Sequence, residues 1–206
     1  MNRNKSTQQS RREFLRASLT LPAVILLEGS GIRAAAPAQV LPATPVCGEG
    51  GDITPPQTEG PFYKPSSPKR TSLIEPGIKG TRILLQGYVR WTDCKPIDRA
   101  LVDFWQADAD GVYDNAGYKL RGHQFSDNSG RYSLETIIPG LYPGRTRHFH
   151  VKVQAPNRPV IITTQLYFPE EPGNKRDRIF NEKLLMAVRE TSAGKVATFD
   201  FVLNIG

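Results

Sequence analysis

Cysteine and long hydrophobic runs are scarce in this sequence, and each scarcity excludes a class of protein. The two cysteines, Cys47 and Cys94, are too few for a four-thiolate zinc site or an iron–sulfur cluster. The apolar stretch from Leu19 to Leu27 is about nine residues long, whereas a membrane-spanning helix needs roughly 20. The net charge is +7, but residues 1–36 carry +4 of it, and the remaining +3 shows no basic stripe interleaved with aromatics. We therefore expect no nucleic-acid partner and no transmembrane segment in the mature chain.

The N-terminus has the pattern of an export signal. The run Ser10-Arg11-Arg12-Glu13-Phe14-Leu15-Arg16 resembles a bacterial twin-arginine signal, and the small residues at 34–38 suit a signal peptidase. We expect residues 1–38 to be a signal peptide and the protein to be periplasmic or secreted. The alternative is a basic, disordered N-terminus. In an exported protein, an even pair of cysteines favours a Cys47–Cys94 disulfide over two unpaired thiols.

Proline and glycine are abundant, and they divide the rest of the chain into short segments. The 17 prolines and 18 glycines favour turns. Residues 39–80 lack periodicity and predict an extended N-terminal arm. Residues 81–206 predict a mainly β domain, an antiparallel β-sandwich with one short helix. The expected helix is 181–189, and the expected strands are 83–89, 100–106, 131–138, 148–154, 160–168 and 196–203.

Two of the three histidines alternate on one expected strand. Side chains at positions i and i+2 of a strand point to the same face, so His148 and His150 could bind one metal ion while Phe149 points into the core. Two tyrosines, Tyr113 and Tyr142, lie in turns before this strand, and no cluster of carboxylates accompanies the histidines. A phenol has a pKa of about 10, so only a strongly Lewis-acidic ion keeps it ionised at neutral pH. Two phenolates with two imidazoles therefore indicate iron(III).

Further motifs around these residues occur in the order found in one enzyme family. They are Gly60-Pro61-Phe62-Tyr63, Val102 to Tyr113, Asp127 to Tyr142, Arg145 to His150, and Thr164-Gln165-Leu166-Tyr167-Phe168. With these motifs, residues 54–168 resemble the intradiol ring-cleavage dioxygenases. Within that family, they are most similar to the branch that contains protocatechuate 3,4-dioxygenases and exported enzymes. The resemblance implies a transthyretin-like β-sandwich that holds one non-haem Fe(III) ion per chain.

The resemblance also implies roles for individual residues. The metal ligands would be Tyr113, Tyr142, His148 and His150. Arg145 would be catalytic by stabilising charge that develops on the ring, and Tyr142 by leaving the iron and accepting a proton. The substrate would be bound by Tyr63, Trp105 and Gln165. The implied reaction uses O2 to cleave a small aromatic diol of the catechol type between its hydroxyl-bearing carbons, giving a cis,cis-muconate-type diacid.

The chain departs from the family pattern near the expected substrate. The loop from Tyr142 to Arg145 is shorter than in the large aromatic-degrading enzymes, and Arg-Thr-Arg-His replaces the usual Arg-Pro-Ala-His. The identity of the catechol and the oligomeric state, a possible homo-oligomer, stay open. Arg147 and Lys152 are nearby cations that could pair with a substrate carboxylate. His123 has no expected role beyond structure.

Two other classes of protein share parts of this pattern. Small transthyretin-like modules bind partners without catalysis and have similar strands and turns, but they do not need His-x-His, Arg145 and a second tyrosine together. An exported copper or zinc protein could use His148 and His150, although those metals rarely take two phenolates. The two histidines could also be ordinary surface residues of a strand.

Overall fold

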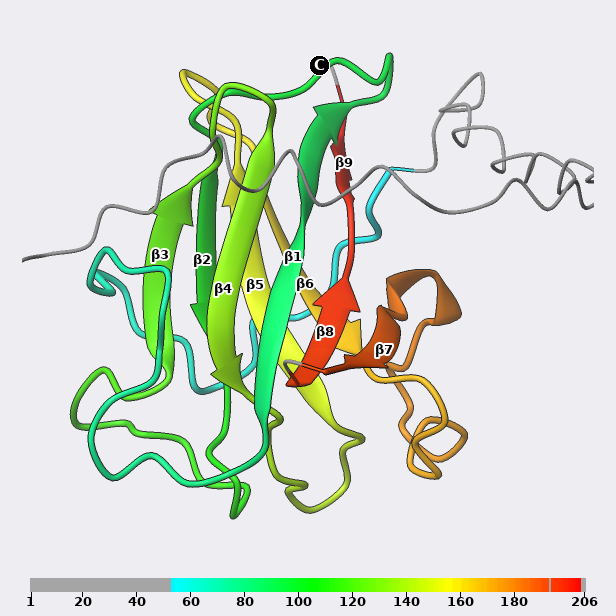
Figure 1. The fold of residues 1–206 in the computed structure, drawn as a ribbon. Coiled ribbons are helices and arrows are strands. Elements are labelled where there is room, and N and C mark those ends of the chain that lie inside the picture. The colour runs from blue at the N-terminus through cyan, green and yellow to red at the C-terminus, as the bar shows by residue number, and fades with distance from the viewer. Residues whose placement is uncertain (1–52, 193, 205–206) are drawn as a thin grey trace, which may run out of the picture. The chain divides into compact units, whose positions relative to one another are not determined.

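Two β-sheets packed face to face form the domain (Figure 1). The computed structural model describes residues 53–192 and 194–204; the predicted signal peptide and Cys47 lie outside this part. One sheet has the strand order β4-β1-β8-β7, with β9 also pairing with β1, and the other has the order β3-β2-β5-β6. The strands are β1 Arg82–Trp91, β2 Leu101–Trp105, β3 Arg121–Phe125, β4 Arg131–Ile137, β5 His148–Gln154, β6 Ile161–Tyr167, β7 Ala187–Thr191, β8 Gly194–Thr198 and β9 Phe201–Leu203. The predicted mainly β sandwich is confirmed.

Most neighbouring strands are antiparallel as predicted, but two pairs around β1 are parallel. β1 runs antiparallel to β4, whereas β8 and β9 both run parallel to it. The single strand expected over 196–203 is divided because the Asp200 carboxylate, rather than a backbone carbonyl, accepts the Tyr88 backbone N–H at 2.9 Å. Gly87 permits this break, since a Cβ there would lie 1.8 Å from the Phe199 carbonyl oxygen.

The predicted helix over 181–189 is wrong. Asn181 caps a single 3-10 turn, η1 (Glu182–Leu184), and the chain then becomes extended. The Met186 backbone N–H donates to the Tyr167 carbonyl at 2.9 Å, at the end of β6, and the next residues pair with β8 as strand β7. Sheet hydrogen bonds thus replace the helical ones. Of the apolar residues that suggested a helical face, Leu184 ends the 3-10 turn, Leu185 follows it, and only Val188 lies on the edge strand β7.

The strands β2 and β5 separate a hydrophobic core from the face that carries the histidines. Phe149, Val151 and Val153 of β5 are buried in the main core, which also holds Val102 and Phe104 of β2. His148 and His150 alternate with these residues and lie on the opposite face of the sheet. They are nevertheless buried, because the segment before β1 covers that face.

The covering segment is the predicted arm, of which residues 53–80 are described. Its Gln57 backbone N–H donates to the Thr163 carbonyl on β6 at 2.7 Å. The Ser67 hydroxyl donates to Asp103 on β2 at 2.7 Å. The Arg70 backbone N–H donates to the His123 carbonyl on β3 at 2.9 Å. The arm therefore crosses the four-stranded sheet from one edge to the other.

Two further predictions concern the whole chain. Cys94 is disulfide-bonded, while its predicted partner Cys47 lies outside the described residues. Within the described ranges, no helix has the length and apolar character needed to cross a membrane.

Candidate active site

The structure brings together the four residues predicted to bind metal. His148 and His150 lie on β5, Tyr113 follows β2, and Tyr142 follows β4. The ring centroids of the two histidines are 4.7 Å apart, and those of the two tyrosines 6.0 Å apart. Tyr113 lies 6.1 Å from His150, and Tyr142 lies 5.8 Å from His148. Side chains from three separate segments thus surround one position.

Both imidazoles present a nitrogen to that position. Their Nε2 atoms are 3.1 Å apart. The Thr146 carbonyl lies 2.7 Å from His148 Nδ1, so Nδ1 carries the proton and Nε2 keeps its lone pair. Burial lowers the pKa of His148 to about 4, and burial together with His148 lowers the pKa of His150 well below its usual value. Both rings are therefore neutral at neutral pH, as metal binding requires.

Tyr113 is buried without a hydrogen-bond partner for its hydroxyl. Burial raises the pKa of this phenol, and the neighbouring Tyr142 raises it further. An unpaired buried hydroxyl costs about 1–3 kcal/mol. A metal cation at the position between the four rings would remove this cost by binding the phenolate. The orphaned hydroxyl and the two facing Nε2 atoms therefore fit a metal site.

The two loops that carry the tyrosines are fastened to each other through glycines. The Gly140 backbone N–H donates to the Asp108 carbonyl at 2.6 Å. Gly111 has a φ of +82°, and a Cβ there would lie 2.1 Å from the Leu141 carbonyl oxygen. No other residue can combine that backbone conformation with so close an approach. This contact brings the loop of Tyr113 directly against the loop of Tyr142.

Arg121 joins the Tyr113 loop to the arm. It is buried, and its guanidinium donates to the Asp114 carbonyl at 3.0 Å and to the Phe62 carbonyl at 2.5 Å. Phe62 in turn stacks on Tyr113, with ring centroids 4.4 Å apart and an angle of 15° between the planes. The arm thus holds one face of a candidate ligand.

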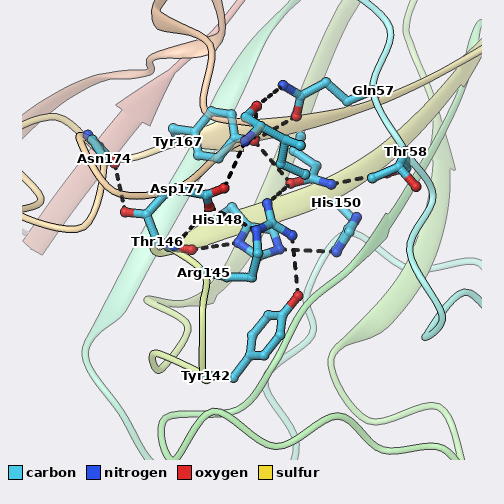
Figure 2. A network of polar contacts seen from close by, with 12 residues as sticks. Gln57, Thr58, Tyr142, Arg145, Thr146, His148, His150, Tyr167, Asn174 and Asp177 are labelled. Atoms are coloured by element: carbon cyan, nitrogen blue, oxygen red, sulfur yellow. Dashed lines mark hydrogen bonds and ion pairs between the residues drawn. The ribbon is translucent and has the colours of Figure 1, made fainter.

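Arg145 lies at the centre of a polar network (Figure 2). Its Nε donates to Asp177 at 2.8 Å, its Nη1 donates to the Tyr142 hydroxyl at 3.2 Å, and its Nη2 donates to Gln165. Gln165 Nε2 donates to the Thr58 carbonyl at 3.0 Å. Burial alone would lower the pKa of Arg145, but the Asp177 carboxylate more than offsets this, and the pKa is raised. The guanidinium is a fixed positive charge beside the tyrosine and histidine rings.

The two aromatic residues predicted to bind substrate have different positions. Trp105 is 2% exposed and stacks on His150, with centroids 4.8 Å apart and planes at 9°. Tyr63 meets Trp105 edge-on at 4.9 Å and is half-buried. Trp105 therefore supports a candidate ligand, and Tyr63 is the more accessible of the two.

Sequence reasoning missed three contributors to this site. Asp177 holds Arg145, the Thr146 carbonyl holds His148, and Arg121 holds Phe62. A backbone carbonyl has no sequence signature. Asp177 lies in the irregular segment 169–180, where no pattern distinguishes it from its charged neighbours. Arg121 begins a strand whose sequence, Arg-Gly-His-Gln-Phe, shows no apolar alternation.

Comparison with known proteins agrees with this architecture. The model of the family described as "Dioxygenase" matches residues 58–205. The chain is 28% identical to 6-chlorohydroxyquinol 1,2-dioxygenase of Cupriavidus pinatubonensis, over 73% of this chain and 64% of the relative. It is 29% identical to catechol 1,2-dioxygenase of Candida albicans, over 60% of this chain and 50% of the relative. The chain thus spans less than two thirds of the length of these curated relatives.

Solved structures of related proteins have a fold similar to that of this chain. The dioxygenase domain of a dioxygenase carbohydrate-binding protein fusion from Streptomyces sp. SirexAA-E is 54% identical, with a TM-score of 0.73 over 75% of this chain and 100% of that one. An intradiol ring-cleavage dioxygenase from Tetranychus urticae is 25% identical, with a TM-score of 0.68 over 74% and 94% of the two chains.

Fold, site and comparisons together define a β-sandwich whose buried histidines and tyrosines face one position. The chain belongs to the intradiol ring-cleavage dioxygenase family. Membership favours the dioxygenase interpretation over the passive transthyretin-like module and over the copper or zinc protein.

Proposed function

We propose that the protein is a non-haem Fe(III) dioxygenase that cleaves a catechol-type ring between its two hydroxyl-bearing carbons, giving a cis,cis-muconate-type diacid. The observation that carries this proposal is the meeting of two neutral imidazoles and two phenols, one with an unpartnered buried hydroxyl. The ligands would be Tyr113, Tyr142, His148 and His150. Bound there, iron(III) would supply Lewis acidity that keeps the phenols and the diol ionised and prepares the ring for reaction with O2.

Tyr142 is the phenol suited to move a proton. Its Oη already accepts a hydrogen bond from Arg145 Nη1, whereas the Tyr113 hydroxyl has no partner. If Tyr142 were not bound to a metal, its Oη could take a hydroxyl proton of the diol and keep the hydrogen bond from Arg145. Tyr113 has no such alternative and would stay a ligand.

Arg145 would stabilise the negative charge that develops on the ring. Its guanidinium is held on three sides, by Asp177, Tyr142 and Gln165. A charge fixed before the reaction needs no reorganisation when the anionic ring forms. Gln165 and Tyr63 would border the substrate, and Trp105 would keep the His150 ring in place.

We further propose that the substrate ring carries no carboxylate. Arg147 Nε is paired with Glu171 at 2.7 Å, and the same guanidinium donates to the Pro139 carbonyl. Lys152 is paired with Glu59 and lies 3.4 Å from the centre of the Tyr63 ring. A substrate carboxylate would have to displace these contacts. We expect kcat/KM for catechol or hydroxyquinol to exceed that for protocatechuate by about 10-fold or more, measured as oxygen uptake. A preference for protocatechuate would refute this proposal.

Iron loading and oxygen uptake test the proposed reaction. Protein loaded with stoichiometric iron should be burgundy to red from phenolate-to-iron(III) charge transfer, and it should consume O2 with catechol. His148→Ala should abolish both properties. The control His123→Ala should preserve both, because His123 hydrogen-bonds to Ser67 under the arm, away from the candidate ligands. A wild-type protein that stays colourless with iron would contradict the proposal.

We propose that the protein acts outside the cytoplasm, after export by the twin-arginine route. The arginine pair at residues 11–12 supports this, as does a disulfide at Cys94. Cell fractionation of a bacterial host that expresses the full chain should find the mature protein in the periplasm or medium. The double variant Arg11→Lys, Arg12→Lys should leave it in the cytoplasm, and unchanged export of that variant would argue against the route.

A further inference from the structure

Three consecutive residues before β5 are each fastened to one loop, residues 171–177. Arg145 Nε donates to Asp177 at 2.8 Å. The Thr146 hydroxyl donates to Asn174 at 2.7 Å. Arg147 Nε donates to Glu171 at 2.7 Å. Figure 2 shows Arg145, Thr146, Asn174 and Asp177 in this arrangement beside the histidines. The loop thus holds the chain immediately before the His-x-His strand by three side-chain hydrogen bonds.

Asp177 accepts more hydrogen bonds than the other residues of this loop that contact residues 145–147. Its side chain is 1% exposed, and its Oδ2 accepts from both Arg145 Nε and the Thr146 backbone N–H, the latter at 2.9 Å. Its Oδ1 accepts the Ile179 backbone N–H at 3.1 Å. A buried carboxylate with several donors is itself well fixed. Asp177 can therefore hold other groups in place.

Two of the three contacts of Asp177 lead to groups of the candidate active site. The Nε contact orients the Arg145 guanidinium so that its other two nitrogens meet Tyr142 and Gln165. The Thr146 contact fixes the residue whose carbonyl lies 2.7 Å from His148 Nδ1. A cavity of about 530 Å³, bordered by Arg145, Gly144 and Glu171 among others, lies beside the pair. Without Asp177, the Arg145 side chain would have space and another carboxylate to turn towards.

We propose that Asp177 is a positioning residue for ring cleavage: it fixes the Arg145 guanidinium directly and the His148 imidazole through Thr146. Asp177 contacts neither the substrate ring nor the candidate metal ligands, and it acts only through Arg145 and Thr146. This inference rests on the proposed function for its catalytic consequence, while the positioning itself can be observed without metal or substrate.

The substitution Asp177→Asn separates positioning from packing. Asparagine has nearly the same shape, and its carbonyl oxygen can still accept the Thr146 N–H, but it provides no charge for Arg145. The matched control is Glu171→Gln, which removes the neighbouring ion pair to Arg147 on the same loop. Asp177→Ala removes all three contacts of Asp177, to Arg145, Thr146 and Ile179.

Proton–nitrogen NMR of the metal-free protein reads the positioning directly. The Arg145 Nε–H should give a slowly exchanging signal, assigned by its loss in Arg145→Lys. We expect this signal to exchange faster and weaken in Asp177→Asn, because the oxygen that accepts it has lost its charge, to disappear in Asp177→Ala and to persist in Glu171→Gln. The His148 Nδ1–H signal should persist in Asp177→Asn and weaken only in Asp177→Ala. An unchanged Arg145 signal in Asp177→Asn would overturn the proposal.

Kinetics of the iron-loaded enzyme test the consequence. A misplaced Arg145 charge stabilises the transition state less, while it changes the affinity for the substrate little. We therefore expect kcat of Asp177→Asn for catechol to fall about 10- to 100-fold, with KM changed less than about threefold. Glu171→Gln should stay within about twofold of wild type. Equal losses in both variants would refute the proposal and indicate general loosening of the loop.

The same experiments distinguish failure of the two proposals. If the wild-type protein cleaves no catechol but Asp177→Asn still weakens the Arg145 signal, the positioning holds and the proposed reaction is wrong. If the wild type is active and Asp177→Asn keeps both its Arg145 signal and its kcat, the reaction holds and the positioning is wrong. A thermal unfolding curve like that of wild type will confirm that Asp177→Asn folds.

Discussion

A buried hydroxyl with no partner makes Tyr113 costly to keep in the metal-free protein. We predict that Tyr113→Phe stabilises the metal-free protein by about 1 kcal/mol or more, because it removes an unsatisfied polar atom and keeps the ring. The same substitution should abolish the oxygen uptake of the iron-loaded protein and should weaken and shift its red colour, because Tyr142 remains as the one phenolate ligand. Urea unfolding and the visible spectrum measure the two opposite effects.

Tyr132→Phe is the matched control for this experiment. Tyr132 is as deeply buried, but its hydroxyl donates to the Phe199 carbonyl at 2.8 Å. Its removal should therefore destabilise the protein by about 1 kcal/mol and leave the colour unchanged. If both variants shift stability in the same direction, the hydroxyl of Tyr113 has a partner after all.

His148 makes the stability of the metal-free protein depend on pH. Its pKa is about 4 in the folded protein and about 6.5 in an unfolded chain. Between pH 6.5 and pH 4, His148 is protonated in the unfolded chain but neutral in the folded protein. The free energy of unfolding is therefore unaffected by His148 above pH 6.5 and falls as the pH drops from 6.5 towards 4. We predict that wild type loses about 2–3 kcal/mol more than His148→Gln between pH 7 and pH 4.5, measured by urea unfolding. Parallel losses would show that His148 does not titrate in this way.

Single residues were predictable where a pattern or a motif marks them. The alternation of His148 and His150 around Phe149 predicts one shared face, and the structure has it. The positions of Tyr113 and Tyr142 followed from ordered motifs, and the structure brings both beside the histidines. Their binding of metal stays a prediction. Asp177 could not be predicted, because its contacts depend on where an irregular segment packs.

At the scale of elements, the two tyrosine loops depend on Gly111. We predict that Gly111→Ala separates the loops, because it adds a Cβ 2.1 Å from the Leu141 carbonyl oxygen to a strained positive φ. Gly144→Ala is the control: its φ is +79°, but nothing lies within 4 Å of the added Cβ. The control should cost about 1–2 kcal/mol in unfolding free energy and keep iron binding. Gly111→Ala should cost more and lose bound iron, measured by metal analysis; equal behaviour would show that the contact does not set the site.

Elements were predictable where apolar residues alternate, and not where tertiary contacts decide. The strand over 148–154 was predicted to the residue. Strand β3 was missed because its pairing with β2 and the arm, not its own sequence, makes it a strand. The helix over 181–189 was wrong because Leu184, Leu185 and Val188 fit a helical spacing, while hydrogen bonds to β6 and β8 impose extended structure.

At the scale of the whole molecule, the disulfide is the prediction that links the N-terminal region to the domain. We predict that mass spectrometry of the unreduced protein finds one peptide that joins Cys47 to Cys94. Cys94 follows the end of β1, has a φ of +71°, and is disulfide-bonded. Two freely alkylated cysteines would contradict the pairing. The boundary at residue 80 between arm and sandwich also stays a prediction, although residues 53–80 pack closely on the sheet.

The arm that covers the histidine face has a consequence for the rate of metal exchange. Gly60 lies so near His150 that an added Cβ would be 3.4 Å from the ring, and Thr58 is hydrogen-bonded to Gln165. An ion held beneath the arm could enter or leave only when this segment detaches, a local opening with its own free energy. Exchange would then be slow and would accelerate in mild denaturant, well before global unfolding. A protein that crosses a membrane already folded would carry its ion with it, instead of acquiring one from whatever metals its destination contains.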